Sequence, residues 1–299
     1  MRGSFVIGVG VIVGAIIIGG GIALGVAALD AGSPTPETGA QLGLDPTDHL
    51  GGRGVVPLEV DAELGALEAY FVQPDATLLP PPGGLREEVW DLMAQIMTPE
   101  RAVAAITTYK VGIDPDSERI AWVVAHQQAH DGWILGVNLA KAEDHTALIA
   151  ALIHEYGHLI EFREGQVVQL ADGCTTLILP EGCALPGGYL DAFFRAFWAD
   201  YGGEAPDAAN ASVDEARRLY ASRPDAFVSE YAALNITEDF AESFAAYVHT
   251  DGEIPADAYG GKLAFFDRFG ETAQIRNEIR TRLDGTLGTL APQCTATRC

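Results

Sequence analysis

The stretch LIAALIHEYGHLIEF, residues 148–162, holds two histidines, His154 and His158, four positions apart, with Glu155 directly after the first. In an α-helix, residues four apart lie on the same face, one turn from each other. Both imidazoles can therefore reach one zinc ion at nitrogen–metal distances of about 2.0–2.1 Å. The competing interpretation is an ordinary core helix with two hydrogen-bonded histidines. Because two histidines and a glutamate are costly to bury without partners, the pattern favours a zinc site.

Glu155 has a different place on the same helix. It is rotated by about 100° from His154 around the helix axis, so it lies beside the metal and not on it. From there it can take a proton from a water molecule that zinc activates, and later deliver a proton to a leaving amine. Gly157 removes a side chain close to this site. The helix is therefore a candidate for hydrolytic chemistry.

A catalytic zinc ion usually has three protein ligands and one open position. The downstream stretch TEDFAESFAAYV, residues 237–248, holds Glu238 and Glu242 four apart, again on one helical face. One of these carboxylates can bind zinc, and the other can accept a hydrogen bond from a ligand imidazole and fix its orientation. An acidic helix that faces solvent is the alternative. The aromatic Phe240 and Phe244 indicate instead that much of this helix is packed.

The two motifs together carry a resemblance. HEYGH, followed later by a tyrosine, six residues and EDFAE, resembles the gluzincin metallopeptidases, in particular the catalytic domain of anthrax lethal factor and its secreted relatives. The resemblance covers roughly residues 120–250, and only the two motifs are specific. It implies zinc ligands at His154, His158 and Glu238, with Glu155 as the general base.

The same resemblance implies two further roles. Glu242 would accept a hydrogen bond from a ligand imidazole, and Tyr231, seven residues before Glu238, would stabilise the oxyanion of the tetrahedral intermediate. An ordinary packed tyrosine is the alternative for Tyr231. The segment between the motifs is longer than in compact members of the family, which leaves the substrate preference open.

The pattern along the chain predicts an α+β fold, with a few strands followed mostly by helices. Strands are expected at 107–114, 120–126 and 132–140, whereas 58–72 is undecided between strand and helix. Helices are expected at 85–97, from Asp144 to about Glu164, and around 189–201, 212–222, 237–249 and 262–283, the last with a break at Gly270. The resemblance implies a zincin-like metallopeptidase domain at 58–285. In that fold, a small sheet would pack on the active-site helix, and its edge strand near 133–139 would bind substrate as an added strand.

The N-terminus predicts export. From Phe5 to Leu29 there is no charged residue, and this run is long enough to span a bilayer. Arg2 before it and Asp30 after it orient the following chain outside. A cleaved signal peptide at 1–29 is the alternative, and a buried core helix is a third. Residues 30–57 are rich in Gly, Pro and Thr and indicate a linker, so the domain is expected on the outer face of the cell membrane or secreted.

The chain has four cysteines, which allow three pairings. Proximity in sequence favours Cys174–Cys183 and Cys294–Cys299, the second within a tail at 286–299. None has the C-x-x-C spacing of a structural zinc site. An even number of cysteines agrees with an oxidising compartment.

The formal net charge is −24, from 18 basic and 42 acidic residues. This balance argues against nucleic acid as a partner, because phosphate neutralisation needs Lys and Arg. An acidic surface weakly favours basic peptides. A second histidine pair, His126 and His130, lies in a stretch that predicts a strand and a turn, where four residues span about 13 Å and cannot share a metal.

Two functions follow from these patterns. The first is an extracytoplasmic zinc metalloendopeptidase that hydrolyses peptide or protein substrates. The second is a non-catalytic binding or scaffold module on the cell surface that keeps a metal for stability. A general base at Glu155 and a tyrosine at Tyr231 favour the enzyme, because a scaffold has no use for either.

Overall fold

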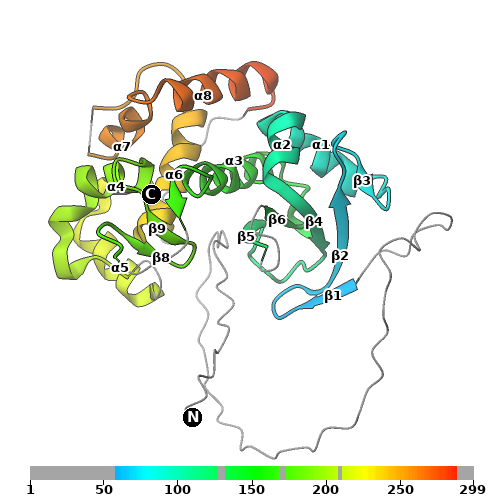
Figure 1. The fold of residues 1–299 in the computed structure, drawn as a ribbon, viewed down its shortest axis with the longest axis horizontal. Helices are drawn as coiled ribbons and strands as arrows, with labels where there is room; N and C mark the ends of the chain where they lie inside the picture. Colours follow the sequence, from blue (N-terminus) through cyan, green and yellow to red (C-terminus); the bar gives the residue numbers. More distant parts are fainter. Residues whose placement is uncertain (1–57, 127–131, 169–172, 208–210, 257, 288–299) are drawn as a thin grey trace, which may run out of the picture.

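The computed structural model describes residues 58–126, 132–168, 173–207, 211–256 and 258–287, whose arrangement is shown in Figure 1. The predicted N-terminal helix, the linker and nearly all of the predicted tail lie outside these ranges, as does the Cys294–Cys299 pair. None of the described helices combines the length and the apolar character needed to cross a bilayer. The larger sheet belongs to the first half of the described chain and most helices to the second.

A mixed sheet of six strands occupies one side of the molecule (Figure 1). Its strands are β1 (Leu58–Asp61), β2 (Gly65–Val72), β3 (Leu78–Leu79), β4 (Ile106–Gly112), β5 (Ala121–Ala125) and β6 (Trp133–Asn138). The main order is β1-β2-β4-β6-β5, and β3 pairs with β2. Only β4 and β6 run parallel. The undecided segment 58–72 is therefore a strand pair, with Gly65 at a φ of 69° in the turn.

β5, and not the strand near 133–139, stands at one edge of this sheet, and β1 stands at the other end of the main order. The prediction of an edge near 133–139 is wrong, because β6 lies between β4 and β5 and is hydrogen-bonded on both sides. Periodicity along the chain identifies each strand but carries no information on lateral order, which depends on pairing between distant segments. The correction matters because β5 packs against the helix that carries the HEYGH motif, His145–Glu161.

The two faces of β5 differ. Ala121 and Val123 are buried in the main core, whereas Trp122 points to the opposite face and packs with Leu64 and Leu67. Side chains alternate between the two faces of a strand, and helices cover the face that carries Ala121 and Val123. The helix that carries the HEYGH motif therefore lies on the inner face of the sheet.

Eight α-helices are described. The first three are α1 (Leu85–Met97), α2 (Pro99–Ala105) and α3 (His145–Glu161). The later ones are α4 (Tyr189–Phe193), α5 (Val213–Ser222), α6 (Ile236–His249), α7 (Ala258–Phe266) and α8 (Gly270–Arg282). The helix predicted from Asp144 to about Glu164 ends slightly earlier, at Glu161, and the predicted break at Gly270 separates α7 from α8.

The segment between α3 and α6 holds structure that periodicity did not predict. A small sheet in the order β7-β9-β8 is formed by β7 (Val167–Val168), β8 (Ile178–Leu179) and β9 (Gly182–Ala184). The helix expected around 189–201 is α4 followed by a π-helical turn, Phe194–Trp198, and a 3₁₀ segment, Ala199–Glu204. The Cys174–Cys183 disulfide is present, as predicted, with Cα atoms 5.7 Å apart.

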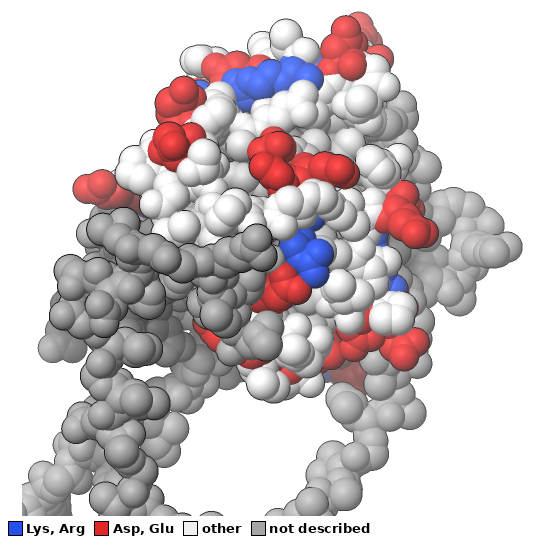
Figure 2. All heavy atoms as spheres, turned by 90° about the vertical axis from the view of Figure 1, so that its right-hand side faces the viewer, with Lys and Arg blue, Asp and Glu red and all other residues white. Residues whose placement is uncertain are grey.

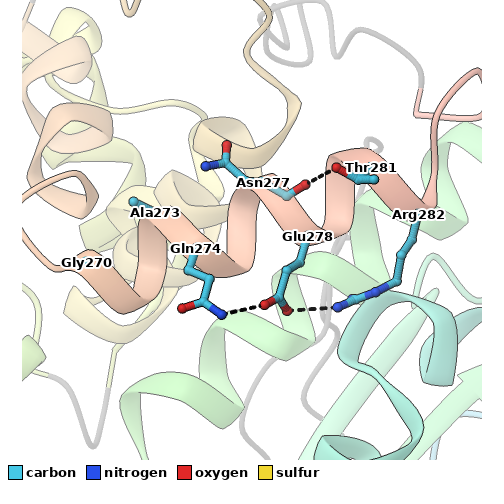
Figure 3. A pocket seen from close by; sticks show the side chains of 7 residues that line it. All are labelled: Gly270, Ala273, Gln274, Asn277, Glu278, Thr281 and Arg282. Carbon is cyan, nitrogen blue, oxygen red and sulfur yellow. Dashed lines mark hydrogen bonds and ion pairs between the residues drawn. The ribbon is translucent and has the colours of Figure 1, made fainter.

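On the face shown in Figure 2, Asp and Glu form more areas than Lys and Arg do, and most of the remaining described surface belongs to uncharged residues. A surface hollow lies along α8 (Figure 3), and its lining residues include Gln274, Glu278 and Arg282. The Glu278 carboxylate accepts hydrogen bonds from Gln274 at 2.7 Å and Arg282 at 2.8 Å. These three side chains are hydrogen-bonded to one another, so none of them is a free reactive group in the hollow.

Candidate metal centre

Helix α3 carries the two histidines into the core. Asp144 begins it, because its carboxylate accepts a hydrogen bond from the backbone N–H of Ala147 at 3.0 Å. The helix is almost entirely buried from Leu148 to Glu161, so it has no polar face to solvent. His154 and His158 are both fully buried. Polar groups held this deeply require partners inside the protein or a bound ion.

Helix α6 brings the acidic motif to the same place. Asn235 begins it, accepting hydrogen bonds from the backbone N–H groups of Thr237 at 2.9 Å and Glu238 at 3.0 Å. Asn235 is itself buried, although it lies in a glycosylation pattern. Its side chain is therefore committed to the start of the helix, and Glu238 follows in the first turn, where the helix dipole favours a negative charge.

Small residues let the two helices approach closely. A Cβ atom added at Gly157 of α3 would lie 3.0 Å from the Cα of Ala241 and 3.4 Å from the Phe244 ring, both on α6. The sequence predicts that Gly157 clears space near the metal. The structure shows that the space it clears is at the crossing of α3 and α6. This close crossing brings Glu238 within reach of both histidines.

Three side-chain atoms meet at one point. His154 Nε2 lies 3.1 Å from His158 Nε2 and 3.2 Å from Glu238 Oε2, and His158 Nε2 lies 3.4 Å from the same oxygen. A tetrahedral ion with ligands at about 2.0–2.1 Å has ligand atoms about 3.3 Å apart. The three residues form the one described group that has the spacing to hold a metal ion. The distances thus match three corners of a tetrahedron.

Two further carboxylates set the orientation of the imidazoles. His154 Nδ1 lies 2.9 Å from Glu242 Oε1, and His158 Nδ1 lies 2.6 Å from Glu161 Oε1. When both imidazoles are neutral and each Nδ1 donates its proton, both Nε2 atoms direct lone pairs toward Glu238 Oε2, which then accepts no hydrogen bond from either histidine. Three acceptors face one another with nothing positive between them, so the residues present fit a cation.

Glu161 is a member of this site that the sequence reasoning missed. It lies in the quoted stretch, three residues after His158, so its side chain falls on the same helical face. That spacing is a usable signal, because a ligand histidine commonly donates its other N–H to a carboxylate. Ser229 was also missed: its hydroxyl donates a hydrogen bond to Glu242 Oε2 at 2.6 Å. No pattern in the sequence marks that serine.

The shifted pKa values of Glu238 and His154 indicate that the site favours positive charge. Burial opposes ionisation of Glu238, but the neighbouring charge of His158 and hydrogen bonds to both histidines lower its pKa to about 2. Burial also lowers the pKa of His154, but hydrogen bonds to Glu238 and Glu242 outweigh it and raise the value to about 9. In the absence of a metal, the site therefore draws a proton onto an imidazole.

Glu155 lies beside this group on the side of the sheet. It is fully buried, and burial raises its pKa to about 7, although the neighbouring histidines oppose this rise. Neither of its oxygens completes a hydrogen bond with a described side chain, and the backbone of Val123 in β5 is near enough to lower its pKa in part. A carboxylate with a pKa near neutrality suits a group that both accepts and returns a proton.

Tyr231 begins a 3₁₀ turn, Tyr231–Ala233, which is separated from α6 by two residues. Its ring centroid is 6.1 Å from that of His154. Burial and the nearby Glu238 carboxylate raise the pKa of its hydroxyl well above the ordinary value of 10. The hydroxyl therefore keeps its proton at neutral pH and can donate a hydrogen bond.

The structure thus brings together all six residues that the sequence singles out for the site: His154, Glu155, His158, Tyr231, Glu238 and Glu242. The second histidine pair of the sequence, His126 and His130, is described only in part. His126 follows the edge strand β5, and His130, which was predicted to lie too far away to share a metal with it, is outside the described residues.

Comparison with known proteins adds no relative. No protein-family model matches this chain, and neither a curated protein nor a solved structure does so. The functional argument therefore rests on the geometry and chemistry of the site itself.

Proposed function

We propose that this chain is a zinc-dependent metallopeptidase of the gluzincin type with a zincin-like fold. The observation that carries the proposal is the convergence of His154 Nε2, His158 Nε2 and Glu238 Oε2 at 3.1–3.4 Å, with Glu155 buried beside them. Two imidazole nitrogens and one carboxylate oxygen are a donor set that suits zinc. A set of three leaves one position open, which is the arrangement that catalysis requires.

The chain's own residues account for proton movement and charge stabilisation. Zinc, when bound, would lower the pKa of a water molecule and polarise the scissile carbonyl. Glu155 accepts the proton of that water and returns it to the leaving amine. Tyr231 donates a hydrogen bond to the carbonyl oxygen as it becomes an oxyanion. Glu242 and Glu161 hold the two imidazoles in the tautomer that leaves each Nε2 free to coordinate.

The edge strand β5 supports a peptide as the substrate. It packs against α3, and Glu155 lies near the backbone of Val123 in its middle. An extended peptide that pairs with the free side of β5 would therefore lie alongside the general base. The sequence prediction assigned this task to the strand near 133–139; in the proposal it belongs to β5.

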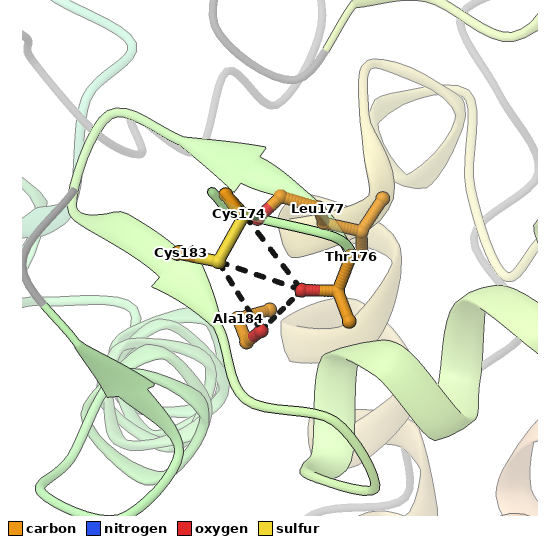
Figure 4. The surroundings of a disulfide bond; sticks show 5 residues. All are labelled: Cys174, Thr176, Leu177, Cys183 and Ala184. Carbon is orange, nitrogen blue, oxygen red and sulfur yellow. Dashed lines mark hydrogen bonds between the residues drawn. A yellow bond between two sulfur atoms is a disulfide. The ribbon is translucent and has the colours of Figure 1, made fainter. Parts of the chain in front are cut away.

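The cellular setting belongs to the same proposal. The uncharged run from Phe5 to Leu29 predicts a membrane anchor or a signal peptide, and either would place the domain outside the cytoplasm. The Cys174–Cys183 disulfide (Figure 4) agrees with an oxidising compartment.

The test is a comparison of zinc content and peptide cleavage in the wild type and in Glu155→Gln. The wild type should hold one equivalent of zinc after dialysis and cleave peptides. Glu155→Gln should hold the same zinc but lose activity by a factor of roughly 10²–10⁴, because only proton transfer is removed. Glu164→Gln, at an exposed position just after α3, is the matched control and should behave as the wild type.

Three outcomes separate the alternatives. Zinc with no cleavage in the wild type supports the scaffold module and contradicts the enzyme. No zinc in the wild type under non-chelating conditions contradicts both. Unchanged cleavage by Glu155→Gln contradicts the role of Glu155 as the general base.

A further inference from the structure

We infer that a hollow on the outer face of the larger sheet, the sheet hollow, is a specificity site that takes a large apolar side chain of the substrate, such as Leu, Met, Phe or Tyr. This inference rests on the proposed peptidase function and extends it to a substrate class. The sheet hollow has a volume of about 160 Å³ and is lined by residues of β1, β2, β4, β5 and β6. It lies on the face of β5 opposite to α3, so it is separate from the metal centre.

The sheet curls so that its outer face is concave. β1 and β5 lie at the two ends of the main strand order, four strand spacings apart, which would be roughly 19 Å in a flat sheet. Glu59 of β1 and Val124 of β5 nevertheless line the same hollow. Arg119, two residues before β5, lies 2.6 Å from Glu63 in the turn after β1. This ion pair joins the two ends of the sheet and makes the hollow part of the fold.

The floor of the sheet hollow is apolar. The Trp122 ring fills the space over Gly136, where a Cβ atom would lie 2.1 Å from it, and it packs with Leu67 of β2. Val124 packs against the same group, and Ile134 lies opposite Val124 in the ladder between β5 and β6. Both of these side chains are only half-buried. A partly exposed apolar floor favours an apolar group that covers it, because that removes its surface from water.

The four charged residues among the described lining are two acids and two bases, and they are paired with each other. Lys110 Nζ lies 2.5 Å from Glu59, and Arg119 lies 3.6 Å from Asp61. The guanidinium group of Arg119 also lies 5.2 Å from the centroid of the Trp122 ring. Its Nε atom is buried without an acceptor, and a single neutral oxygen is enough to satisfy it. The lining therefore has no net charge that would select a cation or an anion.

The edge strand β5 connects the sheet hollow with the position of the substrate. Among the described strands it pairs only with β6, so its other side is open to a peptide strand. Ala121 and Val123 point to the core side, where α3 packs, whereas Trp122 and Val124 point to the hollow. A peptide residue opposite Val123 would point to the side of α3, and its two neighbours along the peptide would point to the outer face.

An antiparallel peptide on β5 would bring a side chain to the hollow. Residues directly opposite each other in such a pair have Cβ atoms about 4.5–5.5 Å apart, so a residue opposite Val124 would lie beside the lining. The size also fits, because an apolar cavity of about 150 Å³ accepts a benzene molecule. Alanine would leave the apolar floor uncovered. A charged side chain would lose water there, where the lining charges already have partners.

The test begins with cleavage of a synthetic random peptide mixture, and mass spectrometry identifies the cut sites. The wild type should prefer Leu, Met, Phe or Tyr at one fixed position from the cut. Defined peptides that differ only at this position then give the magnitude. Their kcat/KM should be about 10–100-fold higher with Leu or Phe than with Ala, Glu or Lys, as expected for the burial of one large apolar side chain.

Variants that fill the sheet hollow test its role. Ile134→Phe fills it from β6 and leaves the open side of β5 as it is. It should lower the ratio of kcat/KM for the Leu peptide to that for the Ala peptide by about tenfold or more. Val124→Phe fills the same space from β5 and is the second variant. Ile113→Phe adds the same ring at an exposed position outside the lining, so it is the matched control and should keep the wild-type ratio.

A second measurement does not depend on turnover. A peptide that carries photo-leucine at the preferred position is bound to Glu155→Gln and irradiated, and mass spectrometry locates the cross-link. The diazirine should react with Trp122, Val124 or Ile134, because these side chains form the floor. Cross-links confined to other segments would place the preferred side chain elsewhere and overturn the inference.

The outcomes separate this inference from the proposal that it extends. A wild type that cleaves peptides with no preference for a large apolar residue, or with a preference for Glu or Lys, overturns the role of the sheet hollow and leaves the peptidase intact. So does a preference that survives both Ile134→Phe and Val124→Phe in folded proteins with full zinc content. A wild type that binds zinc but cleaves nothing overturns the peptidase and, with it, this inference.

Discussion

Two adjacent acids on α6, Glu238 and Asp239, are both buried but differ in their partners. Asp239 is fully satisfied: Lys262 lies 2.5 Å away, Trp198 donates a hydrogen bond at 2.7 Å and Ser243 donates one at 3.3 Å. Glu238 Oε2 faces the Nε2 atoms of two histidines, and it accepts no hydrogen bond from them when both imidazoles are neutral. One carboxylate carries its counter-charge within the chain, and the other is complete only with an added cation.

The difference teaches how to tell a structural buried charge from a functional one. A buried ion pair that is fully hydrogen-bonded, such as Asp239 with Lys262, connects α6 to α7 and needs nothing from outside. The ammonium group of Lys262 lies 3.9 Å from the Phe227 ring centroid, so its other side is covered as well. A buried acid that converges with imidazole lone pairs is the opposite case, and it marks a place for a metal.

The largest expected effect comes from changing each acid in turn. Glu238→Gln should weaken zinc binding by more than ~100-fold, because it removes a ligand and not only a supporting group. Asp239→Asn should lower the free energy of unfolding by about 3–5 kcal/mol, because it leaves Lys262 buried without its charge partner. Zinc titration and thermal unfolding of both variants measure the two effects.

The distinction between Glu238 and Asp239 would be wrong if either variant showed the effect expected of the other. A Glu238→Gln variant that unfolds as readily as Asp239→Asn, or an Asp239→Asn variant that loses zinc while still folded, would show that the two acids do not have separate tasks. Lys262→Met offers a further check, since it should destabilise the fold without changing zinc stoichiometry.

A smaller effect is expected from the carboxylates behind the histidines. Glu242→Gln and Glu161→Gln should each weaken zinc binding by about 10–100-fold while the three ligands stay in place. Competition with a chelator of known affinity measures this loss. The control is Glu164→Gln, which is exposed and should leave the affinity unchanged. If Glu161→Gln binds zinc as tightly as the wild type, its hydrogen bond to His158 does not support the metal.

The pH dependence of zinc binding should follow the raised pKa of His154, about 9 without metal. Zinc binds the neutral imidazole, so below this pH the metal must displace a proton. The metal-free site holds more protons than the loaded one, and the apparent affinity should therefore rise with pH, by up to about tenfold per unit for each proton released, and level off near pH 9. Calorimetry in buffers with different ionisation enthalpies counts the protons. An affinity that does not change between pH 6 and 8 would contradict this coupling.

The smallest expected effect is that of Gly157→Ala. The added methyl group would meet Ala241 Cα at 3.0 Å and press α3 away from α6. Overpacking of a core costs about 1–3 kcal/mol, and the better helix propensity of alanine returns up to about 1 kcal/mol, so a net loss of about 1 kcal/mol is expected. Denaturant unfolding measures it. A gain in stability would mean that the two helices have room to separate.

Much of this site could be read from short-range patterns. The four-residue spacing of His154 and His158 and of Glu238 and Glu242 places each pair on one helical face, and both helices form where predicted. Glu161 was readable by the same rule and was missed. The part played by Ser229 could not be read, because its hydrogen bond to Glu242 comes from the segment before α6 and follows no helical or strand period.

The sequence by itself determined which residues share a helical face, because the geometry of an α-helix is local and repeats every few residues. It also determined where α3 begins, through the side chain of Asp144. Only the tertiary structure decided that β5 is an edge strand and that Gly157 lies at the crossing with α6. It also decided that Glu238 faces two histidines while its neighbour Asp239 faces a lysine. Those outcomes depend on contacts between distant segments, which are set by packing in the core and not by the order of residues along any one element.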